Sequence, residues 1–160
     1  MKTYNYERTK AVEYAKFWAY KRNPEYYNFD LLGGDCTNFI SQCVFAGSNQ
    51  MNFTNLTGWY YINLNDRSAS WSSVEYFYKF IMNNKNLGPF AREVPNSQLE
   101  IGDVIQLGRT TGEFYHSLII SKIENDNIYV CAHTRDALDK PLNSFYYERS
   151  RFIHILGVKK

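Results

Sequence analysis

The chain has 160 residues, 18% of them aromatic, which suits one globular domain with a substantial core and excludes a disordered chain. Its net charge of +2, with both signs balanced, gives no reason to expect a nucleic-acid partner. We therefore predict a single domain over residues 1–160, while composition leaves its oligomeric state open.

The N-terminal region predicts a helix and contains no targeting segment. Residues 6–22 carry alanines and aromatics at helical spacing, and Asn23-Pro24 ends the pattern. The residues before this helix lack the apolar stretch of a secretory signal peptide. No other stretch reaches the apolar length of a transmembrane helix. We expect neither a signal peptide nor a membrane span, and the export route stays open.

A tight turn at Gly33-Gly34 precedes a second predicted helix, over residues 36–46, which Gly47 closes. Asp35 occupies the N-cap position, where its carboxylate would accept a backbone N–H of the first turn. Cys36 then stands where the positive end of the helix dipole favours a thiolate. The pattern alone leaves two interpretations open, a nucleophile and a small buried hydrophobic residue.

The three cysteines indicate neither a disulfide framework nor a zinc site. Cys36 and Cys43 lie two helical turns apart, about 10 Å along the axis, which is too far for a disulfide. Their spacing is not that of zinc ligands, and three histidines do not complete a set. We interpret Cys43 and Cys131 as core residues, and we expect no metal and no cofactor.

Residues 48–69 form a polar, irregular segment interrupted by an aromatic cluster. Long loops inside compact domains often carry function. Trp59 and Tyr61 therefore either line a substrate groove or fill the edge of the core. A further helix is predicted behind the capping box Ser72-x-x-Glu75.

From Gly102 onward the hydrophobic period changes from that of helices to that of strands. Four strands are predicted, over residues 103–107, 116–123, 128–133 and 152–158. Helices followed by an antiparallel sheet define an α+β fold.

Two histidines lie on the middle strands, which form a hairpin around residues 124–127. With a turn of two or four residues, Ile120 faces Cys131, and His116 and His133 share one face of the sheet. Diagonal neighbours on one face are about 7–8 Å apart between backbones. That distance allows the two rings to meet, as a base and the residue that orients it must do.

A three-residue turn would reverse this parity and bring Asp136 to the face of His116. Asp136 is therefore the rival of His133 for the orienting position, and an aspartate would stabilise an imidazolium more strongly. His154, among apolar residues of the last strand, is predicted to be structural.

Several motifs together resemble the cysteine amidase domain family of bacteria. In chain order they are Asn23-Pro24-x-Tyr26-Tyr27, Gly33-Gly34-Asp35-Cys36-Thr37-Asn38-Phe39-Ile40-Ser41-Gln42, Gly58-Trp59-Tyr60, Ser70-Trp71-Ser72, Gly102-Asp103-Val104-Ile105-Gln106, His116-Ser117 and His133-Thr134-x-Asp136. The resemblance covers nearly the whole chain. That family is similar to the papain-like peptidoglycan hydrolases of the NlpC and CHAP types. The resemblance implies a papain-like fold, with N-terminal helices packed on a C-terminal antiparallel sheet.

The resemblance also implies the roles of the site residues. Cys36 corresponds to the nucleophile, His116 to the base and His133 to the polar residue that orients the base, which favours His133 over Asp136. The long segment between Cys36 and His116 departs from the relatives, so their substrate contacts are not carried over.

Two residues beside Cys36 have supporting roles in this interpretation. The oxyanion is expected to bind the backbone N–H of Cys36 and a neighbouring donor at the helix start. Asp35 caps the helix and takes no chemical step. Asn38 either donates its side-chain amide to the oxyanion or serves helix packing.

The expected function is hydrolysis of an amide or peptide bond of bacterial peptidoglycan, through a thioester on Cys36. This substrate lies in the extracellular cell wall, and the sequence does not specify which of its bonds is cut. Two alternatives stay open. One is a non-catalytic cell-wall binding module that uses Trp59 and Tyr61, and the other is an acyl or amide transferase.

Overall fold

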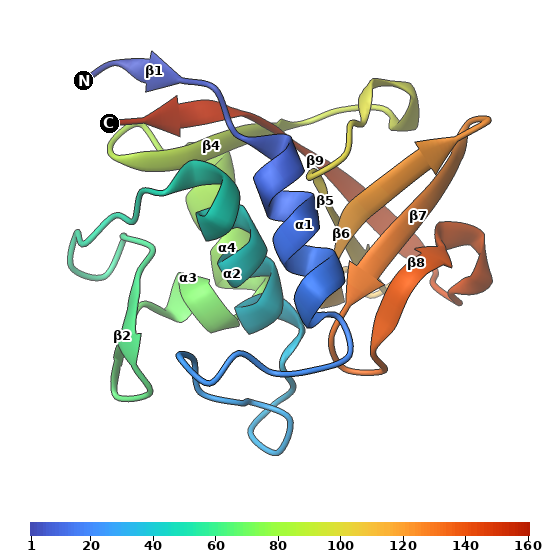
Figure 1. Ribbon diagram of the computed structural model, residues 1–160, viewed down its shortest axis with the longest axis horizontal. Helices are drawn as coiled ribbons and strands as arrows, with labels where there is room; N and C mark the ends of the chain where they lie inside the picture. Colours follow the sequence, from blue (N-terminus) through green and yellow to red (C-terminus); the bar gives the residue numbers. More distant parts are fainter.

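A computed structural model describes all residues, 1–160, and its architecture is α+β (Figure 1). The helices are α1 (Arg8–Trp18), α2 (Cys36–Ser48), α3 (Ala69–Ser72) and α4 (Val74–Asn83). The strands of the main sheet are β1 (Thr3–Tyr4), β4 (Gly88–Glu93), β5 (Val104–Gly108), β6 (Phe114–Glu124), β7 (Asn127–Ala132), β8 (Ala137–Pro141) and β9 (Arg149–Lys159). None of the helices combines the length and apolarity needed to cross a membrane.

The main sheet has seven antiparallel strands in the order β1-β9-β5-β6-β7-β8, and β4 pairs with β9 as well. A separate hairpin consists of β2 (Tyr61–Asn63) and β3 (Asp66–Arg67). The helices gather on one side of the sheet, with α1 and α2 side by side (Figure 1). The four predicted strands are confirmed as β5, β6, β7 and β9, while β4 and β8 were not predicted.

The core has two parts, one on each face of the sheet. Between helices and sheet, the buried residues of α2 pack against residues such as Val104, Ile119 and Cys131. Behind the sheet, a smaller cluster contains Leu118 and Ile120 of β6 with residues of β5, β7 and β8. Adjacent residues of β6 thus belong to different clusters, as alternation along a strand requires.

The β6–β7 hairpin has the expected turn but not the expected register beyond it. Asn125 and Asp126 form a two-residue turn with positive φ angles of 52° and 64°, as tight hairpins require. A bulge between Ile120 and Lys122 then shifts the pairing by one residue. Cys131 consequently faces Ile119, so the predicted pairing of Cys131 with Ile120 is wrong.

The end of α2 also differs from the prediction. The helix continues to Ser48 and ends at Asn49, which takes the left-handed conformation with φ of 49°. Gly47 lies inside the helix, not after it. A Cβ at this position would come within 2.5 Å of the Tyr6 ring, so the glycine allows close packing at the start of α1.

Candidate active site

Cys36 is the first residue of α2 and the only cysteine with any exposure to solvent. Its exposed fraction is 8%, whereas Cys43 and Cys131 are fully buried. The prediction that Cys43 and Cys131 are core residues is thus confirmed. Of the three cysteines, Cys36 is the one residue that solvent reaches at all.

The first turn of α2 lies against β6 at the residue after His116. The Cys36 sulfur accepts a backbone hydrogen bond from Ser117, and it lies 3.7 Å from the Thr37 hydroxyl. The hydroxyls of Thr37 and Ser117 are in turn 3.1 Å apart. The fold therefore brings Cys36 and the strand that carries His116 together, although 80 residues separate Thr37 from Ser117.

The Cys36 thiol is not the thiolate that its place at a helix start predicts. Burial raises the pKa of Cys36, and the nearby Asp35 carboxylate raises it further. Hydrogen bonds from Ser117 and Thr37 act in the opposite direction but do not reverse the shift. Desolvation thus outweighs the helix dipole in the resting protein, and the sulfur keeps its proton near neutral pH.

The His116 ring makes no hydrogen bond with the rest of the chain. Only the Ser48 hydroxyl is a buried side-chain polar atom without a partner, so the His116 nitrogens are open to water. Burial lowers the pKa of His116 to about 4, and the positive charge of Arg135 acts in the same direction. The imidazole is therefore neutral at pH 7 and can accept a proton.

His133 does not have the orienting role that was predicted for it. Its Nδ1 lies 2.5 Å from an Asp35 carboxylate oxygen, and its Nε2 lies 2.8 Å from the Trp18 carbonyl oxygen. The ring also stacks on Phe39, with 3.9 Å between centroids. Both nitrogens are occupied, so His133 has none left for His116. Its observed partners connect the ends of α1 and β7 to the start of α2.

Asp136 does not contact His116 either. Its carboxylate binds the Arg22 guanidinium with two hydrogen bonds, of 2.9 and 3.0 Å. Arg22 also binds Asp30, at 2.9 Å. Asp136 is thus part of an ion-pair network beside the site, and the neighbour found for the His116 ring is Phe145, at 6.3 Å between centroids.

The capping role predicted for Asp35 is wrong, and of the two roles left open for Asn38 the structure supports packing. Asp35 makes no side-chain cap on α2. Its Oδ1 instead accepts the Phe29 backbone N–H and the Asn38 side-chain amide, at 2.8 and 2.9 Å. The remaining groups of the Asn38 amide bind the Tyr27 carbonyl oxygen and the Trp71 indole N–H. Asn38 is therefore committed to packing and has no free donor for an oxyanion.

Comparison with known proteins identifies the family. The family described as "Putative amidase domain" matches residues 5–156. The chain belongs to this family. The uncharacterized protein YhbB of Bacillus subtilis (strain 168) is 36% identical over 141 residues, which cover 85% of this chain and 44% of YhbB. The chain thus spans less than half the length of that relative. No solved structure gives a significant match.

In this amidase-family chain, Trp59 is a core residue and does not line a groove. It is fully buried, its indole N–H donates to the Ser41 hydroxyl at 3.0 Å, and its ring lies 4.8 Å from that of Trp71. Tyr61 is half-buried, and its hydroxyl accepts the Tyr27 backbone N–H at 2.7 Å. Of the two groove candidates, only Tyr61 keeps a surface for contact with a ligand.

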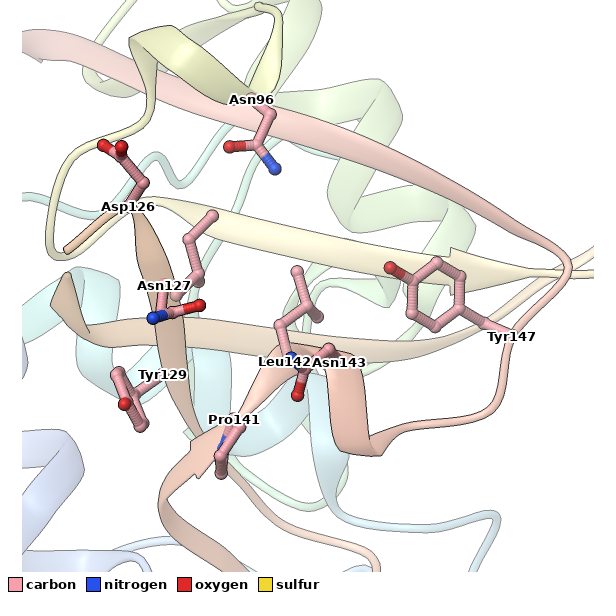
Figure 2. Close-up of a pocket in the computed structure, with 9 residues that line it drawn as sticks. Asn96, Asp126, Asn127, Tyr129, Pro141, Leu142, Asn143 and Tyr147 are labelled. Atoms are coloured by element: carbon pink, nitrogen blue, oxygen red, sulfur yellow. The ribbon is translucent and has the colours of Figure 1, made fainter. Parts of the chain in front are cut away.

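Two hollows in the surface lie apart from Cys36 and His116. Figure 2 shows one of about 390 Å³, where residues 126–129 at the start of β7 face the segment 141–143. The other, of about 720 Å³, lies between residues 52–58 and α4. Neither is lined by Cys36 or His116, so neither is the site around these two residues.

A buried polar chain beside the site was not predicted. Gln106 of β5 donates to the Ser117 hydroxyl at 3.1 Å and accepts from the Arg151 guanidinium at 2.8 Å. Through Ser117 and Thr37 this chain reaches the first turn of α2. Gln106, Thr37 and Ser117 all lie within the family motifs. Thr37 and Ser117 directly follow Cys36 and His116 in the sequence, which was the available signal.

Proposed function

We propose that this protein is a cysteine-dependent amide hydrolase, with Cys36 as nucleophile and His116 as general base. One observation carries the proposal. The single cysteine open to solvent lies beside the strand of the single histidine whose ring nitrogens have no partner in the chain. The amidase description of the family supports the reaction class.

The protonation states support activation of the thiol by a general base. The raised pKa of Cys36 and the lowered pKa of His116 favour a neutral thiol and a neutral imidazole. In the proposed mechanism His116 takes the thiol proton as the sulfur attacks the amide carbonyl. The resulting imidazolium protonates the leaving amine, which leaves a thioester on Cys36. His116 then removes a proton from water, and hydrolysis of the thioester releases the acid.

No hydrogen bond joins Cys36 and His116 in the free protein. In the proposed mechanism, a hydrogen bond between the two forms when the substrate binds. Such catalytic contacts are often long before the substrate is present. The oxyanion would bind the backbone N–H of Cys36, which makes no hydrogen bond within the chain and lies at the positive end of α2. Because the Asn38 amide is occupied, this donor set consists of backbone groups.

We further infer a papain-like arrangement and a bacterial peptidoglycan substrate. The order of helices and sheet, with a cysteine at a helix start and a histidine on a strand, supports the first inference. The second rests on the resemblance of the motifs to peptidoglycan hydrolases.

The test compares the wild type with Cys36→Ala and His116→Gln on purified peptidoglycan. Mass spectrometry of the soluble fragments identifies the cleaved bond. We expect both variants to lose at least about 100-fold in rate, since each lacks a group that takes part in bond breaking. Cys131→Ala is the matched control, because it removes a fully buried thiol and should keep activity once circular dichroism shows it folded. Undiminished cleavage by Cys36→Ala would refute the mechanism.

A further inference from the structure

The turn between β7 and β8, residues 133–136, is fastened to the start of α2. His133 pairs with the Asp35 carboxylate, and the Thr134 hydroxyl accepts the Asp35 backbone N–H at 3.0 Å. Asp136 binds Arg22 through two hydrogen bonds. Three of the four residues of this turn thus bind other parts of the chain, and two of them, His133 and Thr134, bind Asp35, the residue before Cys36.

The turn is held in an unfavourable backbone conformation. Thr134 and Arg135 have positive φ angles of 60° and 61°, a region that residues with a Cβ rarely adopt, and β-branched threonine least of all. Tight turns of this hand usually contain asparagine or glycine. Strained residues persist where surrounding contacts fix them, and they concentrate at functional sites.

Arg135 is the residue of this turn that binds nothing in the protein. Its side chain is exposed and makes no hydrogen bond or ion pair with any other residue. By contrast, Arg22 is bound to Asp30 and Asp136. Arg135 also lies close enough to His116 for its charge to act on that ring. A fixed backbone therefore presents an unpaired guanidinium at the edge of the site.

We propose that Arg135 binds a carboxylate of the substrate, so that the preferred substrates are amides with a free carboxylate near the scissile bond. The planar guanidinium matches a carboxylate with two parallel hydrogen bonds. The inference rests on the proposed function, since it takes Cys36 and His116 as the reacting groups. Acidic peptides meet this requirement, and neutral amides do not.

The test uses two alkylating agents that differ only in charge. Iodoacetate carries a carboxylate and iodoacetamide carries a neutral amide, and both modify the same sulfur. The rate of labelling at Cys36, located by peptide mass spectrometry, is measured for each reagent in the wild type and in Arg135→Gln. We expect the ratio of the iodoacetate rate to the iodoacetamide rate to fall about threefold to tenfold in the variant, as expected for loss of one nearby charge.

Two further variants and a change of salt make the result specific. Arg135→Lys should keep most of the iodoacetate preference, because it keeps the charge. Arg92→Gln, which removes an exposed arginine from β4, should leave the ratio unchanged. High salt should reduce the iodoacetate preference of the wild type but not the iodoacetamide rate.

The outcomes separate this inference from the proposed function. If Cys36 labels readily but the ratio is the same in the wild type and Arg135→Gln, the carboxylate site is refuted and the nucleophile is not. If Cys36→Ala cleaves peptidoglycan as fast as the wild type, the proposed function itself fails, whatever the ratio of labelling rates. The iodoacetamide rate of each variant reports whether its site is intact.

Discussion

His116 is the histidine that the fold leaves free. His133 is occupied at both nitrogens, and the Nδ1 of His154 lies 2.7 Å from the Asp103 carboxylate, in agreement with its predicted structural role. A buried imidazole that lacks an anionic partner loses its proton easily, because the charged form is poorly solvated. The histidine proposed as general base is thus distinguished by its missing contacts as much as by its place next to Ser117, which contacts Cys36.

The lowered pKa of His116 makes folding stability depend on pH. The ordinary pKa of histidine is 6.5, and that of folded His116 is about 4. Between these two pH values the unfolded chain binds a proton that folded His116 does not, so stability falls as the pH is lowered. The full shift corresponds to at most about 3 kcal/mol. We expect this part of the pH dependence to disappear in His116→Gln, as measured by urea unfolding of both proteins at pH 7 and pH 4.5. Parallel losses of stability in the two proteins would show that His116 titrates normally.

At the scale of elements, a buried contact between a carboxylate and an imidazole fixes where α2 begins. Asp35 and His133 are both almost fully buried, and they join the residue before α2 to the end of β7. The ring of His133 lies flat on Phe39, one turn into the helix. This pair therefore positions Cys36 through the backbone and does not act on His116.

Breaking the pair should destabilise the protein strongly. We expect Asp35→Asn and His133→Gln each to lower the free energy of unfolding by about 2–4 kcal/mol, because each leaves its buried partner without compensation. The double variant should lose less than the sum of the two, which chemical denaturation can measure as a coupling energy. Lys122→Gln, which breaks an exposed pair with Glu124, should cost less than about 1 kcal/mol. Strict additivity of the two changes would exclude a direct pairing.

At the scale of the whole molecule, Asp103 joins the N-terminal helix to the sheet. Its buried carboxylate binds Arg8 of α1 at 2.7 Å and His154 of β9 at 2.7 Å. It also accepts the backbone N–H groups of Ile155 and Glu100, each at 2.9 Å. Segments far apart in the sequence, at residues 8, 103 and 154, thus converge on one side chain.

Neutralising this carboxylate should weaken the packing of α1 on the sheet. We expect Asp103→Asn to lower the free energy of unfolding by about 2–4 kcal/mol, since Arg8 loses a buried counter-charge and His154 loses a charged hydrogen-bond partner. Asp126→Asn is the matched control. It makes the same chemical change in an exposed turn with φ of 64°, where asparagine is well tolerated, and its melting temperature should stay close to that of the wild type. Equal melting temperatures for both variants would contradict this role of Asp103.

The sequence by itself determined the features that depend on local patterns. Helical spacing located α1 and α2, alternation located β5, β6, β7 and β9, and the Asn125-Asp126 turn set the first pairs of the hairpin. These predictions succeed because period and turn chemistry act over a few residues. The same local motifs placed Cys36 on the first turn of its helix, which is confirmed, and predicted His116 as its partner.

Only the tertiary structure decided the register and the charges around Cys36. A bulge beside Ser121, whose hydroxyl binds Asp139, shifts β7 against β6. No periodicity predicts such a bulge, because the extra residue is stabilised by a contact from another strand. Likewise, His133 pairs with Asp35 and the thiol keeps its proton because burial depends on segments that are distant in the sequence. Local patterns therefore pointed to Cys36 and His116 as candidate site residues, and the packing of distant elements set their protonation and their neighbours.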